Sequence, residues 1–205
     1  MIGLVDYGMG NRRSVEKALE HVGATVLVSS DSDALARADA LVVPGVGAFP
    51  KAMELLRALE LDAFLIERAA ASVPLLGICL GMHLFFERST ELGGSEGLAT
   101  VPGEVRMLAT GRLKAPQIGW NEVRWERPSV VLEGLGEAAA FYHVHGFVAV
   151  PADDTDVLGT AEYGERFAAV VAHGSFLGVQ FHPEKSSHDG LRLLANWVAA
   201  SDGDA

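Results

Sequence analysis

Residues Pro74 to Phe86 read PLLGICLGMHLFF. The stretch begins with a run of apolar residues typical of a buried strand, passes through the pentapeptide GICLG at 77–81, and continues as an apolar segment of helical character. This G-x-C-x-G pattern is typical of a nucleophile elbow, where glycines permit a tight strand-to-helix turn and the central side chain stands at the edge of a sheet. The stretch therefore predicts a strand that ends on a reactive cysteine, Cys79.

Short β-rich runs alternate with helix-like stretches through the first half of the chain. The runs are Ile2 to Asp6, Thr25 to Val28, Ala40 to Val43 and Val73 to Cys79. An apolar stripe with helical spacing separates the first two runs, with Asn11 at the expected N-cap and Gly23 at the expected stop. The alternation predicts βαβ units, and hence an α/β fold with a mostly parallel sheet flanked by helices.

The pattern changes from Val101 onward to short strands and turns, which predicts antiparallel strands added to the same sheet. A closing helix is expected from the apolar stripe Leu191, Leu194, Ala195 and Val198, and the acidic residues 201–205 are expected to form a frayed tail. Residues 1–200 are predicted to form a single domain, because 205 residues fall within the size of one domain and no segment resembles a linker.

Composition and charge indicate which kinds of partner the protein can bind and in which compartment it is expected. A formal net charge of −11 argues against a nucleic-acid-binding protein, which would need clustered Lys and Arg to neutralise phosphates. A single cysteine cannot form an internal disulfide, which fits a reducing compartment, so a cytoplasmic location is expected. The start of the chain lacks a basic region and no apolar run reaches about 18 residues, so neither a signal peptide nor a membrane anchor is expected.

A second motif lies near the end of the chain, where GVQFHPEKS spans residues 178–186. Pro183 biases His182 toward an extended conformation, and in an extended segment Glu184 would lie on the same side as His182 and orient its imidazole. Alone, the H-P-E motif equally fits a surface histidine beside an ordinary glutamate, just as Cys79 alone fits a buried structural cysteine. The combination of the two motifs favours a catalytic Cys-His-Glu triad.

The chain resembles class I glutamine amidotransferases and, among them, the glutaminase subunits of imidazole glycerol phosphate synthases in histidine biosynthesis. The matching stretches are VDYGMGNRRSVEKAL, VVPGVGAFPKAM, LLGICLGM, GLATVPGEV, KAPQIGWNEV, FYHVHGF and QFHPEKS. The resemblance implies a flavodoxin-like fold and hydrolysis of glutamine without a cofactor, with Cys79 as nucleophile, His182 as general base and acid, and Glu184 as its orienting partner. It also implies a heterodimer with a cyclase subunit, a (β/α)₈ barrel, which receives the ammonia.

A glycine-rich loop at 44–47, PGVG, is expected to help hold the oxyanion. The predicted donors are the backbone N–H groups of Leu80 and of Val46 or Gly47, while Gly45 and Gly47 are expected to border the substrate. The resemblance implies that this loop must reorient before its N–H points inward, and the flanking glycines make such a flip sterically cheap. A simple tight turn is the alternative. The loop lacks the third glycine of a dinucleotide fingerprint, so no cofactor is predicted.

Two positions depart from the family pattern. His83 stands four residues after the nucleophile, where glutamine is usual, and an imidazole cannot copy the donor and acceptor of a primary amide. His83 is therefore expected either to bind substrate differently or to pack against its own helix. Gly146 stands where serine or threonine is usual, and the resemblance implies that Gly146 and Phe147 supply backbone contacts to the amino-acid end of glutamine.

A zinc site is a further alternative, because His143 and His145 share one face of a strand and His182 adds a third imidazole. The resemblance implies no metal there, so none is predicted. It also implies that five residues lie near the cyclase interface, although core packing of the tryptophan remains an equal alternative: Lys114, Gln117, Trp120, Asn121 and Lys185.

Two other functions remain open at this point. One is a free-standing cysteine hydrolase of the α/β-hydrolase type, which the chain order disfavours because Glu184 follows His182 instead of preceding it. The other is a catalytically weak docking subunit that regulates or seals its partner. His83 and Gly146 are the features that keep this second alternative open.

Overall fold

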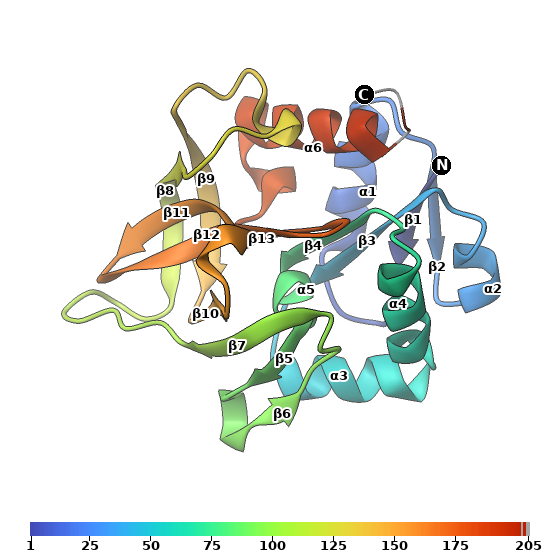
Figure 1. The fold of residues 1–205 in the computed structure, drawn as a ribbon, viewed down its shortest axis with the longest axis horizontal. Helices are drawn as coiled ribbons and strands as arrows, with labels where there is room; N and C mark the ends of the chain where they lie inside the picture. The colour runs from blue at the N-terminus through green and yellow to red at the C-terminus, as the bar shows by residue number, and fades with distance from the viewer. Residues whose placement is uncertain (202, 204–205) are drawn as a thin grey trace.

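The computed structural model describes residues 1–201 and 203, and a twisted sheet runs through the whole molecule (Figure 1). Its first part is parallel and has the order β2-β1-β3-β4-β13. These strands are β1 (Ile2–Val5), β2 (Val26–Ser29), β3 (Ala40–Gly45), β4 (Leu75–Cys79) and β13 (Phe176–Val179). Each predicted run in the first half of the chain corresponds to one of these strands, so the predicted parallel sheet is confirmed.

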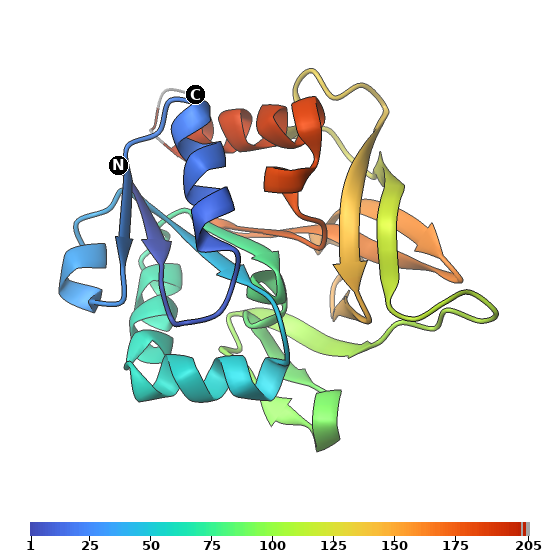
Figure 2. The same ribbon diagram turned by 180° about the vertical axis from the view of Figure 1, so that it is seen from behind.

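Helices cover both faces of the parallel strands (Figures 1 and 2). One face packs against α1 (Arg12–His21) and α6 (Ser187–Ser201), and the other against α3 (Phe49–Ala58) and α4 (Leu61–Ala70). Two shorter helices, α2 (Ser32–Leu35) and α5 (Leu80–His83), follow β2 and β4. Successive strand residues point to opposite faces, so Ala40 and Val42 belong to the first apolar core and Leu41 and Val43 to the second. Within residues 1–201 and 203, no helix has both the length and the apolar character needed to cross a bilayer.

Mostly antiparallel strands extend the sheet beyond β13, as the second half of the sequence predicts, although β5 and β7 pair parallel to each other. The order continues β12-β10-β7-β5-β6, and β11, β8 and β9 branch from β12 as a further antiparallel layer. The strands are β5 (Phe86–Ser89), β6 (Ser95–Glu96), β7 (Val101–Met107), β8 (Gln117–Trp125), β9 (Ala138–His145), β10 (Phe147–Pro151), β11 (Val157–Tyr163) and β12 (Glu165–His173). Short 3₁₀ turns connect them at Glu91–Gly93, Val130–Leu132 and Asp154–Asp156, and a fourth, Pro183–Lys185, precedes α6.

The ends of the first and last helices differ in detail from the sequence expectation. Asn11 occupies the N-cap of α1, but its side chain makes no capping hydrogen bond. Gly23 ends α1 with a φ of +95°, and its N–H donates to the carbonyl of Glu20 at 3.0 Å, as in a Schellman motif. In α6 the predicted Leu194 and Val198 are buried together with Leu193 and Trp197, while the predicted Leu191 and Ala195 are half-buried. Ser201 still belongs to α6, and the rest of the predicted tail, apart from residue 203, lies outside the described residues.

Candidate active site

Cys79 forms a strained elbow between β4 and α5. Its φ of 55° and ψ of −114° are unusual for a residue with a side chain, and such strain is typical of functional positions. A Cβ on Gly81 would lie 1.8 Å from the carbonyl oxygen of Val43, and one on Gly77 would lie 2.7 Å from the Cα of Met82. The predicted elbow is confirmed, but the flanking glycines serve the close approach of neighbouring backbone while the unusual torsion falls on Cys79 itself.

The helix that follows the elbow is shorter than the sequence indicates. It consists of the single turn Leu80–His83, and β5 already begins at Phe86. The dipole of one turn is small, so any stabilisation of negative charge at Cys79 from this helix comes from its first free N–H groups. The apolar residues after His83 are buried in the core between the sheet and α3, which explains why they read as an extended helix.

His182 and Glu184 form a buried pair beside the elbow. The Nδ1 of His182 lies 2.9 Å from the Oε1 of Glu184, and the side chains are only 4% and 0% exposed. The pairing is as predicted, and His182 is extended as expected, but Glu184 lies in the 3₁₀ turn Pro183–Lys185 that follows it. The backbone N–H of His182 donates to the carbonyl of Tyr142 at 2.9 Å, and the hydroxyl of Ser186 donates to the carbonyl of His182 at 2.6 Å. These bonds fix the imidazole in place.

The protonation of His182 follows from its neighbours. Burial lowers the pKa of His182, but hydrogen bonds and charge attraction from Cys79 and Glu184 outweigh this effect and raise the pKa to about 9. The imidazole is therefore protonated at neutral pH and lies next to the sulfur of Cys79. A protonated imidazole can stabilise a thiolate and then deliver its proton to a leaving group.

A cavity of about 400 Å³ opens at Cys79. Most of the predicted catalytic, oxyanion and substrate residues line it, together with His145 and three residues that the sequence did not single out, Glu91, Pro116 and Val144. The predicted residues in its wall are Cys79, His182, Leu80, Val46, Gly47, His83, Gly146, Phe147 and Lys185. Gly45 is an exception, because it lies in β3 behind the elbow, where a Cβ would come within 2.7 Å of the Gly81 nitrogen. Gly45 therefore allows close packing and does not line the cavity.

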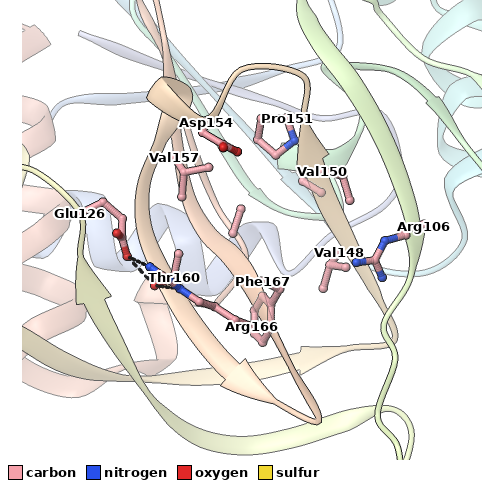
Figure 3. Close-up of a pocket in the computed structure, with 12 residues that line it drawn as sticks. Arg106, Glu126, Val148, Val150, Pro151, Asp154, Val157, Thr160, Arg166 and Phe167 are labelled. Carbon is pink, nitrogen blue, oxygen red and sulfur yellow. Dashed lines mark hydrogen bonds and ion pairs between the residues drawn. The ribbon is translucent and has the colours of Figure 1, made fainter.

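Another cavity, of about 430 Å³, lies among β10, β11 and β12 (Figure 3). Both of its arginines are already paired: Arg106 with Glu165 at 2.7 Å, and Arg166 with Glu126 at 2.5 Å. The described residues that line it include no cysteine and no histidine. Both arginines are held in ion pairs and the described lining offers no nucleophilic thiol or imidazole, so the Cys79 cavity is the candidate active site.

His83 reaches this cavity with its ring already engaged. Its Nε2 lies 2.8 Å from the Oε1 of Gln180, and burial lowers the pKa of His83 to about 4, so the ring is neutral. Gln180 was missed by sequence reasoning although it directly precedes the F-H-P-E motif. Tyr7 was missed too: its buried hydroxyl donates to the carbonyl of Pro44 at 2.8 Å, at the start of the PGVG loop.

His143 and His145 lie side by side under the cavity. The Nδ1 of His145 donates to the carbonyl of Phe147 at 2.9 Å, so its Nε2 accepts from the Nδ1 of His143 at 3.2 Å. Burial, with smaller contributions from neighbouring histidines, lowers the pKa of both rings to about 3. In the part of the chain that the structure describes, no cluster of three His, Cys, Asp or Glu side chains is placed to hold a metal ion.

The five predicted interface residues do not share one surface, because side chains alternate along β8. Trp120 points outward and is 56% exposed, so it belongs to the surface and not to the core. Gln117 points inward and is only 2% exposed, and Asn121 donates inward to the carbonyl of Glu162 at 3.0 Å. Lys114 and Lys185 are exposed. Two residues an odd number of positions apart on a strand cannot face the same partner, which corrects the grouping of Gln117 with Trp120.

Substitution Gly146→Ser tests whether the departure at this position is sterically free. A Cβ at Gly146 would contact only the Cβ of Pro116, at 3.7 Å, which is an ordinary contact distance. We expect the free energy of unfolding to change by less than about 0.5 kcal/mol, measured by thermal or urea unfolding. A loss of several kcal/mol would show that the backbone at Gly146 cannot accept a side chain.

Comparison with known proteins agrees with this geometry. The profile of the family described as "Glutamine amidotransferase class-I" matches residues 3–200. The imidazole glycerol phosphate synthase subunit HisH of Bacillus cereus (strain G9842) is 48% identical over 96% of this chain and 93% of its own, and that of Moorella thermoacetica (strain ATCC 39073 / JCM 9320) is 46% identical over the same shares.

Solved structures share the fold at low sequence identity. A structure titled as a glutamine amidotransferase superposes with a TM-score of 0.77 at 19% identity and covers 98% of both chains. The glutaminase domain of a Trypanosoma brucei protein titled CTPS, solved with bound acivicin, gives a TM-score of 0.71 at 19% identity, covering 98% of this chain and 93% of its own. Because the family profile and the relatives both span nearly its whole length, the chain belongs to the class I glutamine amidotransferase family.

Proposed function

We propose that this amidotransferase hydrolyses glutamine to glutamate and ammonia with the triad Cys79, His182 and Glu184, as the glutaminase subunit of an imidazole glycerol phosphate synthase. The observation that supports it most is the buried pair of His182 and Glu184, with His182 and Cys79 together in the wall of one cavity. The identity of nearly half of all residues with HisH subunits supports the assignment to histidine biosynthesis.

The reaction follows from the charges at the site. The Cys79 thiolate attacks the carboxamide carbon of glutamine, and the oxyanion that forms is held by backbone N–H groups of Leu80 and of Val46 or Gly47. His182 then gives its proton to the leaving nitrogen, so that ammonia departs and a γ-glutamyl thioester remains on Cys79. Water next attacks the thioester while His182 accepts its proton, which releases glutamate and restores the thiolate. Glu184 keeps the imidazole oriented through both steps and stabilises its charged form before the first step and after the second.

The PGVG loop is the part of the site that can change shape. Gly47 has a φ of +101°, and Val46 is exposed at the rim of the cavity. Tyr7 fixes the carbonyl of Pro44 at 2.8 Å, so motion is confined to the peptides that follow it. We propose that occupancy of the partner's site reorients a peptide at Val46 so that its N–H completes the oxyanion hole, which would couple hydrolysis to the presence of an acceptor.

The cyclase subunit, a (β/α)₈ barrel, is the proposed partner in a heterodimer. Ile118 and Trp120 project from β8 with exposed side chains, and the ring of Tyr142 lies 6.2 Å from that of Trp120. The surface reaches the site itself, because Val144 pairs with Ile118 and its carbonyl lies 3.7 Å from the sulfur of Cys79. An exposed aromatic and aliphatic patch beside the nucleophile suits a partner that receives ammonia, and fits a free-standing hydrolase poorly.

Substitution Trp120→Ala tests this surface. We expect the Kd of the complex with the cyclase to rise at least about tenfold, because exposed tryptophans at interfaces commonly contribute more than 1 kcal/mol. The matched control is Ile66→Ala, which removes another exposed apolar side chain from α4, away from β8. Titration calorimetry measures both. Equal affinity for the parent chain and Trp120→Ala would place the interface elsewhere.

Substitution Glu184→Gln tests the orienting role. We expect kcat/KM for glutamine to fall about 100-fold. Because Glu184 helps to raise the pKa of His182 to about 9, its removal lowers that pKa, and the loss of activity at high pH should begin at a lower pH. The pH profile of kcat/KM for the complex measures both effects. The matched control is Asp156→Asn, which breaks a His–carboxylate pair at His173, outside the cavity. An unshifted basic limb in Glu184→Gln would remove Glu184 from the triad.

A further inference from the structure

A buried pair, His83 and Gln180, lies against Cys79 and has no part in the triad. His83 is the last residue of α5, and Gln180 directly follows β13, which pairs with the strand that carries Cys79. Neither side chain is accessible to solvent to any useful degree: Gln180 is 0% exposed and His83 4%. The backbone N–H of Gln180 donates to the carbonyl of Ala169 at 2.8 Å, so the residue is pinned at its base as well.

The hydrogen bond between the two side chains has a definite direction. The Oε1 of Gln180 only accepts, so the Nε2 of His83, 2.8 Å away, carries the proton. The ring is neutral at pH 7, because burial lowers the pKa of His83 to about 4. A neutral imidazole carries one proton, which in this tautomer lies on Nε2. With its oxygen engaged by His83, the amide presents its NH₂ group to the sulfur of Cys79, with the nitrogen 4.0 Å from Sγ. The opposite orientation would put an amide oxygen against the sulfur.

The other groups described near Cys79 do not supply a neutral side-chain hydrogen bond to its sulfur. His182 supplies the charged partner of the sulfur, with Glu184 behind it. The hydroxyl of Tyr7 is also near, and both burial and the charge of Cys79 raise its pKa, but its single proton is donated to the carbonyl of Pro44. The carbonyl of Val144, 3.7 Å from Sγ, can accept a hydrogen bond from the thiol, but it repels a thiolate. Gln180 is therefore the neutral side-chain donor available to the thiolate.

We infer that the amide of Gln180 stabilises the Cys79 thiolate as a second donor beside His182, and that His83 is a positioning residue that fixes the direction of that amide. The inference deepens the proposed function and rests on Cys79 acting as its thiolate. It also explains how a histidine can serve at position 83. The only group that position 83 has to supply is one N–H that donates to the Oε1 of Gln180.

Alkylation of Cys79 by iodoacetamide tests the inference without any need for glutamine hydrolysis. The chain has one cysteine, so loss of free thiol reports Cys79 alone. In Gln180→Leu we expect the alkylation rate at pH 7 to fall roughly three- to tenfold, in line with the net contribution of one ordinary hydrogen bond. The midpoint of the rate against pH should move upward in the same variant. Gln180→Met, closer in shape and also without the donor, should behave in the same way.

Changes at His83 separate positioning from simple packing. His83→Leu frees the amide and should lower the alkylation rate, whereas His83→Gln retains an N–H for the oxygen of Gln180 and should restore most of it. The matched control is Gln117→Leu, which makes the same change at the chain's other glutamine, also buried, and should leave the profile unchanged. Parent-like profiles in folded Gln180→Leu and Gln180→Met would overturn the inference. Equal damage in His83→Gln and His83→Leu would overturn the positioning role.

These outcomes are distinct from failure of the proposed function. If the chain did not hydrolyse glutamine, the alkylation profile of Cys79 would still respond to Gln180 as stated. Conversely, an unresponsive profile in a chain that hydrolyses glutamine through Cys79 would remove Gln180 alone and leave the triad in place.

Discussion

Substitution Cys79→Ala is expected to reduce glutamine hydrolysis by about 10,000-fold or more, because no other group at the site can form the thioester and members of a triad act as a unit. The fold should persist, since alanine removes one sulfur atom and keeps the strained backbone that Cys79 already occupies. Glutamate release in the complex and thermal unfolding of the isolated variant measure the two effects.

A second readout separates hydrolysis from delivery. In the complex with the proposed cyclase partner, Cys79→Ala should lose glutamine-dependent synthesis while added ammonia still supports synthesis, because we propose that the acceptor site lies in the partner. Parent-like glutamate release from the purified variant would exclude Cys79 as the nucleophile. Loss of the ammonia-dependent reaction would mean that Cys79 has a role in assembly.

Among Gly→Ala substitutions in this chain, we expect Gly81→Ala to be the most damaging. The added Cβ would lie 1.8 Å from the carbonyl oxygen of Val43, a backbone atom that cannot move without disturbing β3. We expect a loss of at least about 3 kcal/mol in the free energy of unfolding, together with loss of glutaminase activity. Urea unfolding and glutamate release measure these.

The matched control for this change is Gly146→Ser, which adds a larger group where the nearest atom is 3.7 Å from the new Cβ. A stable and fully active Gly81→Ala variant would mean that the elbow does not depend on close approach between α5 and β3.

The sequence predicted the parallel part of the fold because its information is local. Each strand in the first half is a short apolar run bounded by turn residues, and the glycines around Cys79 mark the elbow. The length of α5 was not predictable in the same way. The apolar run after His83 fits a buried helix or a buried strand, and pairing of Phe86 with Val101 of β7 makes it the start of a strand.

Contacts between distant residues account for most of what the sequence did not predict. His83 and Gln180 are 97 positions apart, and Tyr7 and Pro44 are 37 apart, so no local pattern joins them. The pairing of His182 with Glu184 was predicted because only two positions separate them. The error at Gln117 was different in kind, since the alternation of side chains along β8 already sets it on the opposite side from Trp120.

Release of glutamate from glutamine by the parent chain, measured alone and with the cyclase subunit in the presence of the cyclase's ligand, tests the proposed glutaminase most directly. We expect release that is strongest in the complex with the ligand bound, and that disappears in Cys79→Ala under the same conditions. Absence of glutamate release by the parent chain in every one of these mixtures would contradict the proposed glutaminase.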